Sequence, residues 1–151
     1  MELKKELPQI FEEFADARKN SFLAIKELKE AGTPVIGVFC AFLPREIPQA
    51  MGAAVVSLCS VSNETIPDAE KELPRNLCPL IKSSYGFART DKCPFFYFSD
   101  LIVGETTCDG KKKMFEMLAD FKPVHVIELP NCQTEEGIQM YRRQIIHFKE
   151  F

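Results

Sequence analysis

Short apolar runs alternate with helical patterns along this chain, and this alternation constrains its fold more than any other feature. The runs cover residues 35–39, 53–58, 101–106 and 124–127, and each has the length of a buried strand. Continuous apolar strands that alternate with helices indicate a parallel sheet covered on both faces. We therefore expect an α/β fold with a parallel sheet of about four strands and helices on both faces.

The segments between the runs have the amphipathic pattern of helices. The longest is expected over residues 7–30, ahead of the first strand, with a first apolar stripe made of Leu7, Ile10, Phe11 and Phe14. The polar segment 60–76 is expected as a loop, because Pro67 and Pro74 interrupt it. The remaining helices are expected at residues 44–51, 79–87, 94–99, 109–121 and 134–148. A length of 151 residues predicts a single α/β domain over 1–151.

Composition and charge argue against several classes of protein. The formal net charge is -3, which disfavours general nucleic-acid binding. The sequence has no run of 18 apolar residues, so we expect no membrane span. The N-terminus is charged and lacks the apolar region of a signal peptide, which predicts a cytoplasmic protein. In that compartment the six cysteines are expected as thiols or metal ligands rather than disulfides.

Five of the six cysteines fall where a predicted strand ends or a predicted helix begins. In a parallel sheet these positions share the edge at the carboxyl ends of the strands, where ligands bind. Thiols far apart in the sequence are therefore expected to converge there. The ordinary zinc-finger and thioredoxin spacings are absent, because no C-x-x-C pair occurs. The five cysteines are Cys40, Cys59, Cys78, Cys93 and Cys108.

Cys108 has the strongest local signal of the five. It follows the apolar run 101–103 and precedes a helical stripe, so it lies at a helix N-terminus, where amide N–H groups and the helix dipole favour a thiolate. Three lysines, 111–113, add positive charge nearby. Cys78 and Cys93 each precede a proline, a residue favoured at the first helical position, so both are expected at helix N-caps.

A structural explanation competes with the metal explanation for each thiol. Free cysteine often packs in a core as a small hydrophobe. The apolar neighbours of Cys59 favour core packing for that residue, and the loop position of Cys132 favours an incidental role. His125 lies within the last apolar run, which predicts a hydrogen-bonded core histidine.

Two segments resemble the motifs of the 2-hydroxyacyl-CoA dehydratase D-component family. The first is Asn76-Leu77-Cys78-Pro79-Leu80-Ile81-Lys82-Ser83-Ser84-Tyr85-Gly86. The second is Gly104-Glu105-Thr106-Thr107-Cys108-Asp109-Gly110-Lys111-Lys112-Lys113. The segment 37–47 and the leading helix around 17–19 are similar as well, so the resemblance covers about residues 8 to 150. The family includes 2-hydroxyglutaryl-CoA dehydratase subunits, benzoyl-CoA reductase subunits and double-cubane cluster proteins, and the double-cubane branch looks most similar.

The resemblance implies an oxygen-sensitive iron–sulfur protein with two flavodoxin-like or Rossmann-like α/β domains and a cluster between them. Cysteines that match Cys78 and Cys108 are cluster ligands in the dehydratases, and a further ligand comes from the second domain. In double-cubane members extra cysteines serve a larger cluster, and Cys40 and Cys93 are the candidates here. An ATP-hydrolysing iron–sulfur activator supplies a low-potential electron. In the dehydratases, a 2-hydroxyacyl-CoA then loses its hydroxyl through a ketyl radical.

Family chains are more than twice as long as this one, and the resemblance places it at their N-terminal half. The second domain is therefore expected to be absent, and the chain to be an N-terminal piece, a truncated product, or a half that acts with another chain. Two alternatives to the iron–sulfur reading remain. One is a non-catalytic remnant or interaction module that dimerises through an exposed apolar patch. The other is a structural zinc-binding domain.

Four further residues are candidates for substrate or partner contacts. Lys111 is expected either to contact CoA phosphates or the acidic activator, or to lie on a solvated helix face. Ser83 and Ser84 are expected either to line the site or to be ordinary exposed helix positions. Glu105 is expected to have a structural role, or else to accept a proton or a hydrogen bond near the cluster.

Overall fold

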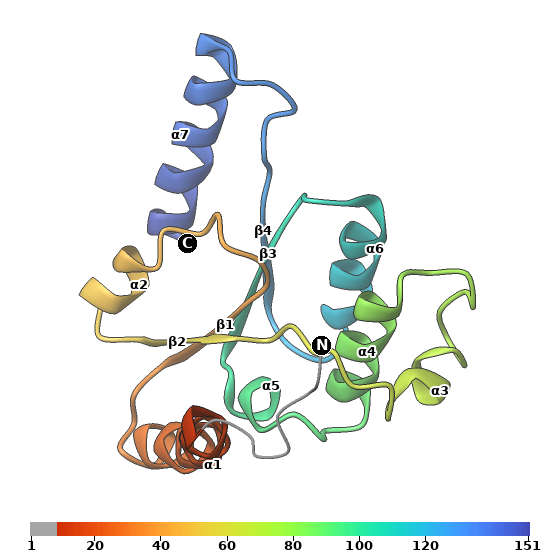
Figure 1. Cartoon of the computed structure of the whole chain (residues 1–151). Coiled ribbons are helices and arrows are strands. Elements are labelled where there is room, and N and C mark those ends of the chain that lie inside the picture. The colour runs from red at the N-terminus through yellow and green to blue at the C-terminus, as the bar shows by residue number, and fades with distance from the viewer. Residues whose placement is uncertain (1–8) are drawn as a thin grey trace, which may run out of the picture.

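A computed structural model describes residues 9–151, in which four strands form one parallel sheet (Figure 1). The strands are β1 (Val35–Val38), β2 (Ala54–Ser57), β3 (Leu101–Glu105) and β4 (Val124–Ile127). The helices are α1 (Gln9–Glu30), α2 (Glu46–Ala50), α3 (Ile66–Ala69), α4 (Pro79–Arg89), α5 (Pro94–Phe98), α6 (Asp109–Leu118) and α7 (Glu135–Glu150). The predicted α/β class, the number of strands and the long leading helix are confirmed.

The strand order in the sheet is β2-β1-β3-β4. The chain runs outward from β1 to β2 and then returns to place β3 on the other side of β1. This reversal makes the gap between the carboxyl ends of β1 and β3 the topological switch point, where open α/β sheets bind ligands. The edge at which the cysteines were predicted to meet is therefore centred on the gap between β1 and β3.

Two apolar clusters cover the two faces of the sheet. One contains Ile102 and side chains of α3, α4, α5 and α6, with Tyr85, Phe96 and Phe115 among its buried members. The other contains Val38, Val103 and Ile127, covered by α2 and α7 through Ile47 and Phe148. Consecutive β3 residues 102 and 103 thus point to opposite faces, as the alternation of side chains along a strand requires.

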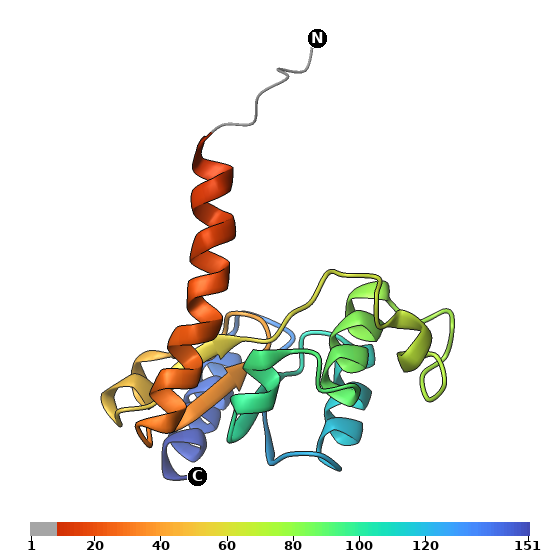
Figure 2. The same cartoon turned by 90° about the horizontal axis from the view of Figure 1, so that it is seen from below.

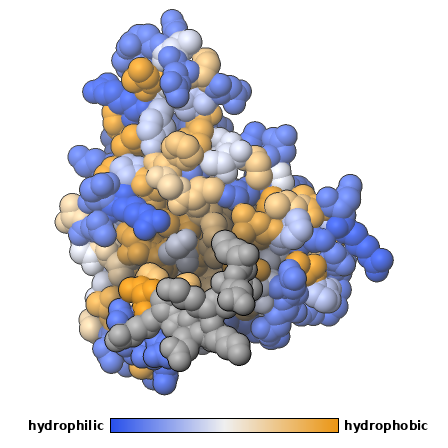
Figure 3. Space-filling model, viewed as in Figure 1, coloured by the Kyte–Doolittle hydropathy of each residue, from blue (hydrophilic) through white to orange (hydrophobic). Residues whose placement is uncertain are grey.

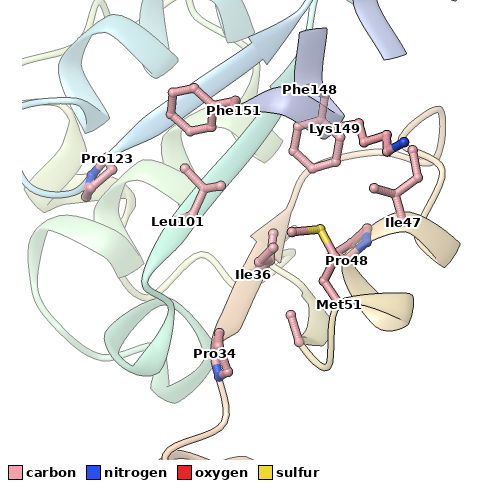
Figure 4. A pocket seen from close by; sticks show the side chains of 11 residues that line it. Pro34, Ile36, Ile47, Pro48, Met51, Leu101, Pro123, Phe148, Lys149 and Phe151 are labelled. Atoms are coloured by element: carbon pink, nitrogen blue, oxygen red, sulfur yellow. The ribbon is translucent and has the colours of Figure 1, made fainter. Parts of the chain in front are cut away.

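The face under α2 and α7 keeps an apolar cavity of about 360 Å³. Ile36 and Leu101 form its floor on the sheet, while Met51 and Phe148 approach from the two helices (Figure 4). A space-filling view has apolar residues near the centre and hydrophilic residues around the rim (Figure 3). The helices α2 and α7 therefore leave part of this face unfilled.

The first half of α1 extends away from the sheet (Figure 2). Only its second half packs, through the buried Ile25 and through Phe22, whose ring lies 4.9 Å from that of Phe95. The first apolar stripe of the helix is exposed, since Phe11 and Phe14 are 52% and 63% exposed, and Leu7 lies outside the described residues. Amphipathic spacing marked a helix correctly, but it could not say whether another element covers the apolar side.

Other differences from expectation are local. The segment expected as a loop contains the single-turn helix α3, because Pro67 suits the first turn of a helix. α6 ends at Leu118, although the helix was expected to continue to residue 121. Phe121 therefore lies beyond the helix in a turn and is 39% exposed. None of the described helices combines the length and the apolar character that crossing a membrane requires.

Candidate functional site at the carboxyl edge of the sheet

Cys40 and Thr107 meet across the switch point between β1 and β3. Cys40 follows the end of β1, and Thr107 follows the end of β3. The Cys40 Sγ lies 3.6 Å from the Thr107 Oγ1, in hydrogen-bond contact. Thr106, next to it, accepts a hydrogen bond from the amide of Leu129 at 2.8 Å, which fastens this turn to the chain beyond β4. Two segments 67 residues apart in the sequence thus meet at the switch point.

Lys111 reaches the same switch point, and its ammonium donates a hydrogen bond to the Cys40 sulfur. The residue is only 8% exposed, so the expected solvated face is wrong for Lys111. Its neighbours Lys112 and Lys113 are exposed and pair with Asp109 and Glu116 of the same helix. A contact between Lys111 and a CoA phosphate or an activator stays a prediction.

The charge on Lys111 is maintained by nearby sulfur. Burial lowers the pKa of its ammonium, but the hydrogen bond to Cys40 and the charges of Cys40, Cys59 and Cys108 offset burial, so the pKa lies above its usual value. Cys59 is exposed, which overturns its expected core packing. β2 ends at Ser57, so Cys59 lies past the packed part of the strand. Lys111 is therefore a buried cation with three cysteines around it.

Cys78 and Cys108 are the N-caps of α4 and α6, as the sequence predicted. Both are exposed, and neither side chain caps its own helix. The two helix starts lie close together, because a Cβ on Gly110 would lie 2.7 Å from the Ile81 Cδ1 and 3.0 Å from the Leu77 Cδ1. Glycine at position 110 thus permits the approach, and two thiols with neighbouring helix N-termini share one edge of the sheet.

Cys93 has a different environment from the other candidate ligands. It is the N-cap of α5, and its sulfur accepts a hydrogen bond from the Phe96 amide at 3.4 Å. It lines a cavity of about 490 Å³ together with Cys59, with Phe22 of α1 on the wall. The structure therefore places Cys93 in a helix cap beside α1.

Ser83 and Ser84 are buried on α4, so the expectation of ordinary exposed positions is wrong. The Ser84 Oγ accepts a hydrogen bond from the Ser60 amide at 3.0 Å, and Ser83 bonds to the Ser60 hydroxyl at 3.0 Å. Both serines thus fasten the segment after β2 to α4. A direct contact of either with substrate stays a prediction.

Glu105 is the last residue of β3 and is completely buried. Its Oε1 accepts hydrogen bonds from the amides of Phe42 and Leu43, each at 2.7 Å. Burial raises the pKa of this carboxyl, although the loop amides and Lys111 act in the opposite direction. Glu105 therefore has the structural contact that the sequence analysis favoured, and it makes this contact to the loop that carries Cys40.

Sequence reasoning missed Lys82, which supports the segment before Cys78. Lys82 is buried, and its ammonium donates to the Glu70 Oε1 at 2.7 Å and to the Arg75 carbonyl at 2.8 Å. The hydrogen bond to Lys82 lowers the pKa of Glu70. No sequence pattern marked this lysine, because its burial is a property of the tertiary structure. A lysine is almost never fully buried without a partner, and Glu70 and the Arg75 carbonyl are its partners here.

His125 lies in the core, as predicted, but its Nε2 has no hydrogen-bond partner within the described part of the chain. Its ring packs instead against His147, Phe148 and Phe151. Burial, and secondarily the charge of His147, lowers the pKa of His125. The core position predicted for His125 is confirmed, but among the described residues the predicted hydrogen bond is not made at Nε2, where aromatic side chains of α7 and of the residue after it pack against the imidazole.

The donors at the sheet edge suit an iron–sulfur cluster in their chemistry. Over residues 9–151, no three His, Cys, Asp or Glu side chains are gathered as a preformed site for a metal ion. Cys40, Cys78 and Cys108 are nevertheless soft donors at one edge, and thiolates are the usual ligands of such clusters. The helix N-termini and Lys111 supply the positive surroundings that a negatively charged cluster requires.

Comparison with known proteins agrees with the resemblance noted in the sequence. A family model described as 2-hydroxyglutaryl-CoA dehydratase, D-component, matches residues 40–151. The chain is 67% identical, over 137 residues, to the Escherichia coli (strain K12) protein named "Putative dehydratase subunit YjiM". That match covers 91% of this chain but only 36% of the relative, so the chain spans about a third of the length of that protein.

Proposed function

Because this chain belongs to the 2-hydroxyglutaryl-CoA dehydratase D-component family, we propose that it is an iron–sulfur subunit of a 2-hydroxyacyl-CoA dehydratase, a lyase. The observation that carries the proposal is the meeting of Cys40 with Thr107 and Lys111 at the switch point. This contact brings a third cysteine to the edge where Cys78 and Cys108 already begin two adjacent helices.

We propose that Cys40, Cys78 and Cys108 bind one [4Fe–4S] cluster. The further ligand that the resemblance implied from a second domain would complete the coordination of the cluster. Cys93 supports the double-cubane alternative less well, because its sulfur caps α5 and lines a cavity beside α1. When bound, the cluster supplies one-electron reduction at low potential.

The residues of the chain have separate roles around the three thiols. Lys111 holds a positive charge beside Cys40 and offsets the negative charge of thiolate ligands. Thr107 orients the Cys40 sulfur through its hydroxyl. The free amides at the starts of α4 and α6 favour negative charge at the same edge.

Substrate and partners follow from the family and are proposals here. The proposed reaction also requires an acyl-CoA substrate, an ATP-dependent iron–sulfur activator, and a second subunit or further domain. The need for a second subunit or further domain is supported by the Escherichia coli relative, because its full sequence is almost three times as long as the part that matches this chain. The cytoplasm is the proposed location, because all six cysteines are free thiols.

Iron and acid-labile sulfide per chain, after anaerobic reconstitution, test the proposal directly. Roughly four of each are expected for a [4Fe–4S] cluster. Cys40→Ser, Cys78→Ser and Cys108→Ser should each lose most of the iron, whereas Cys132→Ser should keep it because Cys132 is an exposed loop thiol. Full iron content in both the Cys78 and the Cys108 variants would refute the ligand assignment.

Two further measurements separate the alternatives. Cys93→Ser loses iron if a double-cubane cluster is present and retains it if three cysteines suffice. Elemental analysis that finds zinc in place of iron would favour the structural zinc site.

The interaction-module alternative rests on α1. Ile10, Phe11 and Phe14 are exposed on the part of α1 that extends from the sheet, which matches the expected apolar patch (Figure 2). Sedimentation of the reconstituted chain decides this point. A dimer without iron would favour the module, and a monomer with iron would favour the proposed function.

A further inference from the structure

Glu105 lies beneath the loop that follows Cys40. It is 0% exposed, and its side chain points to the same face of the sheet as Val103, beneath α2 and α7. Cys40 directs its sulfur the other way, toward Lys111 on α6. The carboxylate and the thiol therefore lie on opposite sides of the loop that joins β1 to α2.

The contacts of Glu105 fix the peptide groups just after Cys40. Two successive amides, of Phe42 and Leu43, donate to one carboxylate oxygen at 2.7 Å. The Tyr141 hydroxyl donates to the Phe42 carbonyl, so the same segment is held from α7 as well. Leu43 is buried in the apolar cluster of this face. The loop is thus held both through its backbone and through the buried Leu43 side chain.

Cys40 has a backbone conformation that requires such support. Its φ of 63° lies in the left-handed region, which residues other than glycine adopt at a cost and keep only where surrounding structure enforces it. The loop amides held by Glu105 begin two residues further on. The sulfur on the other side is held by Thr107 and Lys111.

We propose that Glu105 is a positioning residue for Cys40, holding residues 42–43 so that the left-handed backbone of Cys40 directs its sulfur toward Thr107 and Lys111. This inference deepens the proposed function, because Cys40 is one of the three proposed ligands. It concerns the metal-free chain, however, and can be tested without iron.

The test is the rate at which N-ethylmaleimide labels Cys40 in metal-free protein, followed by peptide mass spectrometry. Glu105→Ala removes the acceptor of both amides, so the sulfur should leave its partners more often and label about tenfold faster. Glu105→Gln keeps an acceptor oxygen in the same place, so its Cys40 should label at a rate within about twofold of the wild-type rate. Cys132, exposed in another loop, is the internal control and should keep its rate in every variant.

Either of two results would overturn the proposal. One is an unchanged Cys40 rate in a Glu105→Ala variant that unfolds cooperatively. The other is equal acceleration in the Gln and Ala variants. If Glu105→Ala does not fold, Glu105→Asp replaces it, since the shorter side chain withdraws the carboxylate from the amides and should give an intermediate rate. Absence of iron in the reconstituted wild-type protein would refute the proposed function, but the comparison of Cys40 labelling rates would still test the role of Glu105.

Discussion

The ammonium of Lys111 contacts the sulfur of Cys40, although 71 residues separate them in the sequence. The contact lies at the switch point between β1 and β3 and joins the loop after β1 to the first turn of α6. A buried cation beside a cysteine is therefore built into the switch point of the sheet.

Lys111 should raise the reduction potential of a cluster bound at this edge. A nearby positive charge favours the more negative, reduced state, so Lys111→Gln should lower the potential by on the order of 50 mV. Lys112→Gln removes the same charge from an exposed position that is paired with Asp109, and it should shift the potential much less. Potentiometric titration of the reconstituted proteins measures both, and equal shifts would contradict a special role for Lys111.

His125 should make the chain less stable in weak acid. Its folded pKa is lowered below the unfolded value of 6.5, so the unfolded chain takes up a proton first as the pH falls through that value. The free energy of unfolding should therefore fall by up to about 1.4 kcal/mol between pH 7.5 and pH 5.5. Urea unfolding at the two pH values measures the change.

The matched variants for this test are His125→Phe and His147→Phe. The first removes the titrating group and should remove that part of the pH dependence, whereas the second keeps His125 and should retain most of it. An unchanged pH dependence in His125→Phe would show that other groups cause it.

Lys82 should matter far more for stability than Lys71, although each ammonium lies 2.7 Å from its carboxylate partner. Lys82→Met leaves the Arg75 carbonyl without its buried donor and should lower the free energy of unfolding by about 1–3 kcal/mol. Lys71 is exposed, and Lys71→Met should produce no measurable change. Similar urea midpoints for the two variants would show that the Lys82 contacts do not stabilise the segment before Cys78.

Gly104 should tolerate alanine less well than Gly110. An added Cβ at Gly104 would lie 2.5 Å from ring atoms of Phe115, a fully buried side chain that packs against Phe39. Gly104→Ala should therefore cost about 1–3 kcal/mol. At Gly110 the nearest atoms are the methyl ends of Ile81 and Leu77, which can turn aside, and alanine favours the helix. Thermal unfolding compares the two, and an equal loss would refute this difference.

Much of the fold could be predicted from the sequence because strands and helices follow local patterns. The apolar runs around residues 35–38 and 101–105 became parallel neighbours, and the cysteine before Pro79 became the N-cap of α4. The leading helix was also predicted, since its spacing is a property of the segment itself. Its exposed first half was not, because burial depends on what else reaches that surface.

The candidate site divides in the same way. The sequence by itself determined that Cys78 and Cys108 begin helices at the carboxyl edge of a parallel sheet, because proline, apolar runs and amphipathic spacing act over a few residues. Only the tertiary structure decided that Cys40 meets Lys111, that Cys93 lines a cavity beside α1, and that Glu105 holds the loop after Cys40. These relationships join residues tens of positions apart, and strand order, which sets them, arises from packing of the whole sheet rather than from any single segment.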